Sequence, residues 1–249
     1  MLTKFNKNLS SDIKEVVLKE NLEYTKMAEF YDLFYKNKNY EKESHFIEEV
    51  IKKPNCSILD AGCGTGNHLL ALHKKGYDVF GFDINKEMLK VAETKLPKRF
   101  EKGDLLTYKT NRKFDLVISF FAVFNHLKSF REFFKAIRNL KQCLNEVGKM
   151  IIDLHNPQKS GEKTEKQGTY QRKMKWRVCK LCSKEFSSIS YKIGDKQFET
   201  KHTFAIFKLK KLKKLLAKNG YTNCDFYENY DISTKATSKS KNIQVVINF

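Results

Sequence analysis

The stretch that decides the fold is Ile58-Leu59-Asp60-Ala61-Gly62-Cys63-Gly64-Thr65-Gly66-Asn67. An apolar run ends at Asp60, three glycines then alternate with small residues, and a helical pattern follows from His68 to Lys75. This order predicts a buried strand, a tight turn and the start of a helix. Glycine suits such a turn because the backbone bends sharply and a ligand can approach where a side chain would collide.

The spacing of the glycines excludes two common nucleotide sites. A dinucleotide fingerprint has the form Gly-x-Gly-x-x-Gly, but here Gly66 comes one residue early and Asn67 stands where a dehydrogenase has its third glycine. No Lys-Ser or Lys-Thr pair follows, as a P-loop requires. Ordinary strand–helix connections also contain glycines, so the meaning of this turn depends on the residues that follow it.

The composition sets the class of protein. A chain of 249 residues can form one large α/β domain with an elaboration. Its 48 Lys and Arg against 29 Asp and Glu give a net charge of +19, which predicts an anionic partner or reflects a lysine-rich proteome. Six scattered cysteines and the lack of a long apolar segment indicate a reduced, cytoplasmic protein with no signal peptide and no membrane contact.

Acidic residues end the next two predicted strands. Asp78–Asp83 is a short apolar run closed by Asp83, at the distance from the glycine turn where an acid reaches a ribose. Its two carboxylate oxygens can accept hydrogen bonds from both ribose hydroxyls, although Asp is also common as a helix N-cap. Asp104 and Leu105 follow a third short strand; together they suit an adenine, whose exocyclic amine donates to a carboxylate and whose ring packs on an apolar side chain.

Strands and helices alternate over residues 57–155, which predicts an α/β fold with a doubly wound, mostly parallel sheet. We expect seven strands, the last two being 223–230 and 242–249 with a loose loop at 233–241 between them. A helix with Ser10 or Ser11 as N-cap is expected near the N-terminus. The predicted units are an N-terminal helical cap (1–55), a core (56–155), an antiparallel β insertion that forms a lid or dimer surface (156–206), and a helix and β-hairpin that complete the core sheet (207–249).

The insertion is basic and polar, with strands expected at 169–178, 186–193 and 197–207. It contains Cys179-Lys180-Leu181-Cys182, the spacing of half a zinc site. A structural zinc site needs four ligands, and no second Cys or His pair of matching spacing accompanies these two. The sequence therefore predicts no metal.

Over residues 57–155 the chain resembles the class I S-adenosylmethionine (SAM) dependent methyltransferases, whose first motif has the form Asp-x-Gly-x-Gly-x-Gly. The resemblance implies an enzyme of this kind with SAM as its cofactor. The residues implied to bind SAM are Asp60, Gly62, Cys63, Gly64 and Gly66 near the methionine part, Asp83 and Ile84 at the ribose, Asp104 and Leu105 at the adenine, and Phe120 at the rim.

A narrower resemblance concerns the N-methyltransferases that dimethylate amino groups on nucleotide-linked deoxysugars. It rests on Tyr31-Asp32-Leu33-Phe34-Tyr35 ahead of Tyr40, on Ser119-Phe120-Phe121 ahead of Asn125-His126-Leu127, and on the late β insertion. It implies that Tyr31 and His126 act at the methyl-acceptor site and that Tyr40 lies near the methionine end of SAM. The segment that follows the fifth predicted strand, Leu154-His155-Asn156-Pro157, lacks the Glu-Pro often found in that group. The identity of the methyl acceptor therefore stays open.

Three functions follow for testing. The first is methyl transfer to a small-molecule acceptor, an amine on a phosphorylated or nucleotide-linked sugar, by a monomer or a homodimer. The second is methylation of RNA such as tRNA, with the basic stretch 163–184 as docking face and Trp176 and Tyr170 stacking on bases. The third is a non-catalytic protein that binds SAM as a scaffold.

Overall fold

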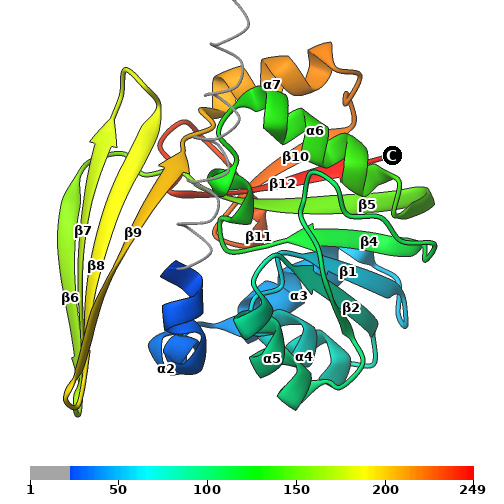
Figure 1. The fold of residues 1–249 in the computed structure, drawn as a ribbon. Coiled ribbons are helices and arrows are strands. Elements are labelled where there is room, and N and C mark those ends of the chain that lie inside the picture. Colours follow the sequence, from blue (N-terminus) through cyan, green and yellow to red (C-terminus); the bar gives the residue numbers. More distant parts are fainter. Residues whose placement is uncertain (1–22) are drawn as a thin grey trace, which may run out of the picture.

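A computed structural model describes residues 23–249 (Figure 1). The helix expected after Ser10 or Ser11 lies outside these residues. Two β-sheets make up the framework, a large mixed sheet and a smaller antiparallel one. Between residues 23 and 249, no helix combines the length and the apolar character that crossing a bilayer requires.

The large sheet is doubly wound, with strand order β11-β10-β12-β5-β4-β1-β2-β3. Its strands are β1 (Ser57–Ala61), β2 (Asp78–Asp83), β3 (Phe100–Lys102), β4 (Phe114–Ser119), β5 (Leu144–His155), β10 (Cys224–Glu228), β11 (Asp231–Lys235) and β12 (Asn242–Asn248). The strands from β5 to β3 in this order pair in parallel. The strands from β5 to β11 pair antiparallel.

Helices cover both faces of the large sheet, as Figure 1 shows. They are α3 (Tyr40–Ile51), α4 (Asn67–Lys74) and α5 (Lys86–Lys95) on one face, and α6 (Phe130–Lys141) and α7 (Leu209–Lys218) on the other. Neighbouring residues of β1 divide between the two cores, because Ile58 packs in the cluster of α3 and Leu59 in the cluster of α6. Burial on both faces explains why these strands are almost continuously apolar.

The smaller sheet is a meander of β6 (Gly161–Gln167), β7 (Tyr170–Cys179), β8 (Lys184–Ile193) and β9 (Lys196–Ala205). The short helices η1 (Ala28–Phe30) and α2 (Tyr31–Phe34) pack against it. The Phe34 ring stacks on Tyr191 at 4.4 Å and on Tyr170 at 5.3 Å between centroids. Met88 of α5 joins the same cluster, so this N-terminal segment connects the small sheet to the core, as Figure 1 shows for α2.

The expected doubly wound fold and antiparallel insertion are confirmed, but each sheet has one strand more than the sequence predicted. The large sheet has eight strands because β11 forms in a stretch expected to be partly loop. The insertion gains β6, which is almost entirely polar and exposed. Both extra strands lie at an edge of their sheet, where one-sided pairing needs no apolar pattern. Hydrophobic periodicity therefore gave no signal for either.

The turn after β1 is held against β2. The amides of Gly62 and Cys63 both donate to the carbonyl of Phe82, at 2.8 and 3.0 Å. Gly62 has φ +87°, and a Cβ built there would lie 2.5 Å from Cγ1, 2.9 Å from Cγ2 and 3.2 Å from Cβ of Val123. Rotation of the Val123 side chain cannot relieve this contact, because both methyl groups and Cβ are close. Only glycine fits.

We expect Gly62→Ala to destabilise the fold more than Gly194→Ala. Both glycines have positive φ, but the space around Gly194 is open, so that variant measures the backbone strain alone, about 1–2 kcal/mol. The collision with Val123 should cost Gly62→Ala a further ~1–3 kcal/mol. Urea denaturation measures the free energy of unfolding of both variants. Equal losses would show that the site tolerates the extra methyl group.

Candidate active site

A cavity of about 360 Å³ opens where the carboxyl ends of β1, β2 and β4 meet. Ligands of open α/β sheets bind at this edge, and the volume lies in the range of small-molecule sites. The residues of the sequence prediction that line the cavity are Tyr31, Tyr40, Gly62, Cys63, Gly64, Asp83, Ile84, Asp104, Leu105, Phe120 and His126. The fold thus brings together segments that lie almost a hundred residues apart.

Asp83 ends β2 and faces the cavity with its charge supported by backbone amides. One carboxylate oxygen accepts from the amide of Gly64 at 2.9 Å, and the other accepts from the amide of Asn85 at 2.8 Å. Burial raises the pKa of Asp83, and the hydrogen bonds from these two backbone amides oppose the rise. Each carboxylate oxygen can accept a second hydrogen bond, so both can also bind a diol.

Asp104 lies in the turn after β3. Its Oδ1 accepts from the amide of Leu106 at 2.7 Å, which fixes the carboxylate beside the apolar side chains of Leu105 and Leu106 in the cavity wall. Because β3 is the neighbour of β2, this acid and Asp83 lie along one edge of the sheet. A flat apolar surface beside an acceptor is the arrangement that a purine with an exocyclic amine requires.

Asp60 and Gly66, also predicted to bind the cofactor, are not among the residues that line the cavity. Gly66 caps α4 with φ +76°, and a Cβ there would lie 2.8 Å from Cζ of Phe100. Asp60 is 1% exposed, and its Oδ2 has no hydrogen-bond partner among the described residues. Burial and the nearby Asp83 raise the pKa of Asp60 to about 8.

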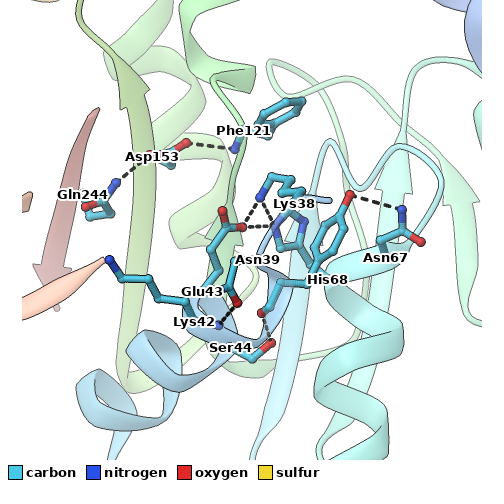
Figure 2. A network of polar contacts seen from close by, with 11 residues as sticks. Lys38, Asn39, Lys42, Glu43, Ser44, Asn67, His68, Phe121, Asp153 and Gln244 are labelled. Atoms are coloured by element: carbon cyan, nitrogen blue, oxygen red, sulfur yellow. Dashed lines mark hydrogen bonds and ion pairs between the residues drawn. The ribbon is translucent and has the colours of Figure 1, made fainter. Parts of the chain in front are cut away.

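A buried ionic cluster lies behind the cavity wall, as Figure 2 shows. The Glu43 carboxylate forms an ion pair with Lys38 and a hydrogen bond of 2.5 Å with Nε2 of His68. The Lys38 ammonium also lies over the rings of Tyr40 and Phe121, at 4.7 and 5.1 Å from their centroids. The cluster therefore braces two aromatic residues of the wall.

The charges of this cluster follow from its burial. Desolvation lowers the pKa of His68, which keeps the imidazole neutral near pH 7. Burial alone would raise the pKa of Glu43, but the bonds from His68 and Lys38 outweigh it and lower this pKa. The sequence analysis missed all three residues. A signal was present, because Glu43 lies on the apolar face of α3, three residues before Phe46.

A second buried acid holds the chain where it leaves β4. Phe121 and Ala122 both have positive φ, 64° and 61°, which is costly for residues other than glycine. Oδ2 of Asp153 accepts from the amide of Phe121 at 3.0 Å, and Oδ1 accepts from Gln244 at 2.7 Å (Figure 2). This strained corner places the Phe121 ring in the cavity wall.

The N-terminal segment closes the cavity over the glycine turn. The Asp32 carboxylate accepts from the Thr65 hydroxyl at 2.7 Å and from the Asn67 amide at 2.8 Å, and it pairs with Lys95 at 2.6 Å. Asn67 also donates to the Tyr40 hydroxyl at 3.2 Å. Asp32 thus ties the segment that carries Tyr31 to the segment that carries the glycines.

His126 and Tyr31 line the same cavity. The Tyr24 hydroxyl lies 3.0 Å from Nε2 of His126, and Phe204 of β9 packs against the imidazole at 4.8 Å between centroids. The Asn125 amide donates to the carbonyls of His155 and Ala205, at 2.9 and 2.7 Å. The loop that carries His126 is therefore fixed both to the core and to the insertion.

Comparison with known proteins agrees with this geometry. Residues 58–148 match the family model described as a methyltransferase domain. The chain is 31% identical over 132 residues to the dTDP-3-amino-3,4,6-trideoxy-alpha-D-glucopyranose N,N-dimethyltransferase of Streptomyces venezuelae. This match covers 51% of the chain and 56% of the relative, so the chain spans little more than half the length of that protein.

Two solved structures share the fold over most of the chain. A SAM-dependent methyltransferase from Clostridium acetobutylicum aligns with a TM-score of 0.77 and 24% identity, covering 91% of this chain and 98% of its own. SAM-bound CalS10, an amino pentose methyltransferase from Micromonospora echinaspora, aligns with a TM-score of 0.70 and 19% identity, covering 88% and 96%. Residues 58–148 therefore match a methyltransferase domain, and most of the chain shares the fold of these two solved methyltransferases.

Proposed function

We propose that this protein transfers a methyl group from SAM to an amine on a small molecule, an amino sugar linked to a nucleotide. The observation that carries the proposal is that the acids Asp83 and Asp104 line the same cavity as Tyr31 and His126. A cofactor and an acceptor can therefore meet in one enclosed space. The N,N-dimethyltransferase of Streptomyces venezuelae supports this class of acceptor.

The residues present fit SAM. Asp83 has free acceptor capacity for the ribose hydroxyls, and Asp104 with Leu105 suits the adenine. Because β1 is the next strand after β2 in the sheet, the methionine part would extend beyond the ribose, toward His68 and Phe120. Oδ2 of Asp60, which is buried and has no hydrogen-bond partner within residues 23–249, lies on that side. When bound, SAM supplies a methyl group that its sulfonium has already activated.

The work left for the protein is to align the acceptor, to exclude water and to remove a proton. Such alignment can contribute about 7–11 kcal/mol in well-oriented systems. Burial raises the pKa of Tyr31 well above its ordinary value, so its hydroxyl stays protonated and orients the acceptor by hydrogen bonding. An amine attacks only in its neutral form, and His126 at the wall is placed to accept its proton. A hydrogen bond between the Tyr24 hydroxyl and Nε2 of His126 fixes the orientation of the imidazole ring.

The insertion contributes to the acceptor end. Its strand β9 supplies Phe204, which packs behind His126, and Glu185 of β8 pairs with His155 at 3.0 Å at the end of β5. The RNA hypothesis receives less support from this sheet. Tyr170 is buried against Phe34 and is not available for stacking on bases, and Lys163 is paired with Glu165 at 2.7 Å. We therefore favour the small-molecule acceptor.

We expect Asp83→Asn to weaken SAM binding by about 10- to 100-fold. A hydrogen bond to a charged group is worth ~1.5–3 kcal/mol, and asparagine loses both the charge and one acceptor. Isothermal titration calorimetry measures the dissociation constant. The control is Asp78→Asn at the other end of β2, where the carboxylate binds Arg99 and Arg112 at the surface. An unchanged dissociation constant in Asp83→Asn would remove Asp83 from the cofactor site.

We expect His126→Asn to lower kcat for methyl transfer by about 10²- to 10⁴-fold, the usual range for a general base, with little change in SAM affinity. Transfer of a labelled methyl group to a nucleotide-linked amino sugar measures the rate. Tyr24→Phe should cause a smaller loss, because it removes one hydrogen bond to the ring and leaves the imidazole in place. His45→Asn, on the exposed surface of α3, is the matched control.

The same assay separates the competing functions. Binding of SAM with no transfer to any amino sugar, and transfer instead to tRNA, would support the RNA enzyme. Binding with no transfer to either acceptor would support the scaffold. Equal rates for His126→Asn and the unmodified protein would take the imidazole out of the reaction.

A further inference from the structure

Four carboxylates lie at or behind the cavity wall, Asp83 half-buried and the others buried, and three of them are supplied with donors. Asp83 accepts from two backbone amides, at 2.9 and 2.8 Å. Asp153 accepts from the Phe121 amide and from Gln244. Glu43 binds Lys38 and His68, as Figure 2 shows. Asp60 differs from all three, because its Oδ2 has no donor among the described residues.

The surroundings of Asp60 do not favour a negative charge. The residue is 1% exposed at the end of β1, opposite Gly81 of β2 and Ile118 of β4. The charged and titratable groups that act on it are Asp83 from β2 and Lys38 from the segment before α3, and the Cys63 thiol lies in the turn after it. Lys38 is the only cation of these, and it is already paired with Glu43.

An isolated carboxylate in such a place retains a proton. Burial without a partner disfavours the charged form, and a second carboxylate nearby disfavours it further. Of the two acids, Asp83 is the one that carries the negative charge, because two backbone amides donate hydrogen bonds to its carboxylate. The rise in the pKa of Asp60 to about 8 agrees with this division.

The direction of the cofactor follows from the strand order. Adenine at Asp104 beyond β3 and ribose at Asp83 beyond β2 leave the methionine part beyond β1, the strand that ends in Asp60 and Ala61. That part of SAM carries two positive charges, an ammonium and the sulfonium, and a carboxylate. It would bring positive charge close to Asp60, which lies behind the cavity wall and whose nearest cation, Lys38, is already paired with Glu43.

We infer that Asp60 is protonated in the ligand-free protein and releases its proton to solvent when the cationic methionine end of SAM binds. The inference rests on the proposed function. The step breaks one O–H bond of the Asp60 carboxyl group, and the proton leaves to buffer. The carboxylate that remains stabilises the bound cations, so cofactor binding and ionisation of Asp60 are a single coupled equilibrium.

This coupling makes the dissociation constant for SAM depend on pH. Binding that releases a proton becomes tighter as pH rises, so the dissociation constant for SAM should fall about tenfold between pH 6 and pH 7. Asp60→Asn imitates the protonated acid in shape and cannot ionise. The variant should bind SAM more weakly than the unmodified protein at pH 7 and should lack the tenfold fall between pH 6 and pH 7.

Calorimetric titration with SAM at pH 7 in phosphate, HEPES and Tris tests the inference, because the observed heat depends on buffer ionisation in proportion to the protons released. We expect about one proton per SAM for the unmodified protein. Asp60→Asn should release about one proton fewer. The amino group of SAM contributes equally to both measurements, so the difference belongs to Asp60. Asp115→Asn, the same change at the opposite end of the sheet, where Asp115 binds Ser57, should leave the count unaltered.

Equal proton counts for Asp60→Asn and the unmodified protein would overturn the inference. If Asp60→Asn folds poorly, ¹³C NMR of labelled aspartate side chains in the unmodified protein gives an independent answer. We expect one carboxyl signal to change from protonated to ionised when SAM is added at pH 7, and constant signals would also overturn the inference. Binding of SAM without proton release refutes this coupling alone, whereas absence of SAM binding at every pH refutes the proposed function.

Discussion

The hydrogen bond from the Gly64 amide to the Asp83 carboxylate joins the turn after β1 to the end of β2. Because β1 and β2 pair in parallel, both strands finish at the same edge of the sheet, and this bond fixes the turn against the acid. The addition of β3 to β2 brings Asp104 to that edge as well. The proposed cofactor site is therefore a consequence of strand order, with the glycines leaving room for the ligand.

The acceptor end depends on a different constraint, the attachment of the N-terminal segment. Asp32 binds the glycine turn through Thr65 and Asn67, while Phe34 packs on Tyr191 of the insertion. The segment thus contacts the core and the small sheet at once, and Tyr31, directly before Asp32, lines the cavity. Loss of either anchor would disturb the position of Tyr31 in the cavity wall.

The local motifs of this chain were readable from the sequence, and the long-range contacts were not. The glycine turn and Asp83 could be identified because each stands at the end of a short apolar strand, and Asp104 because it follows the next short strand. Asp60 follows the same rule, yet its position behind the wall depends on how β1 packs between β2 and β4. The pair of Glu43 and His68 joins helices α3 and α4, 25 residues apart. No periodicity encodes such a pair, and an acid on an apolar helix face is its only trace.

The outer strand of the insertion has a consequence for assembly. β6 pairs with β7 on one side, and an open strand edge invites another chain to pair with it. β6 is exposed on both faces and carries the charges of Glu162, Lys163 and Lys166, which would have to lose water before a second strand could add. Edge-to-edge aggregation through this strand is thereby opposed.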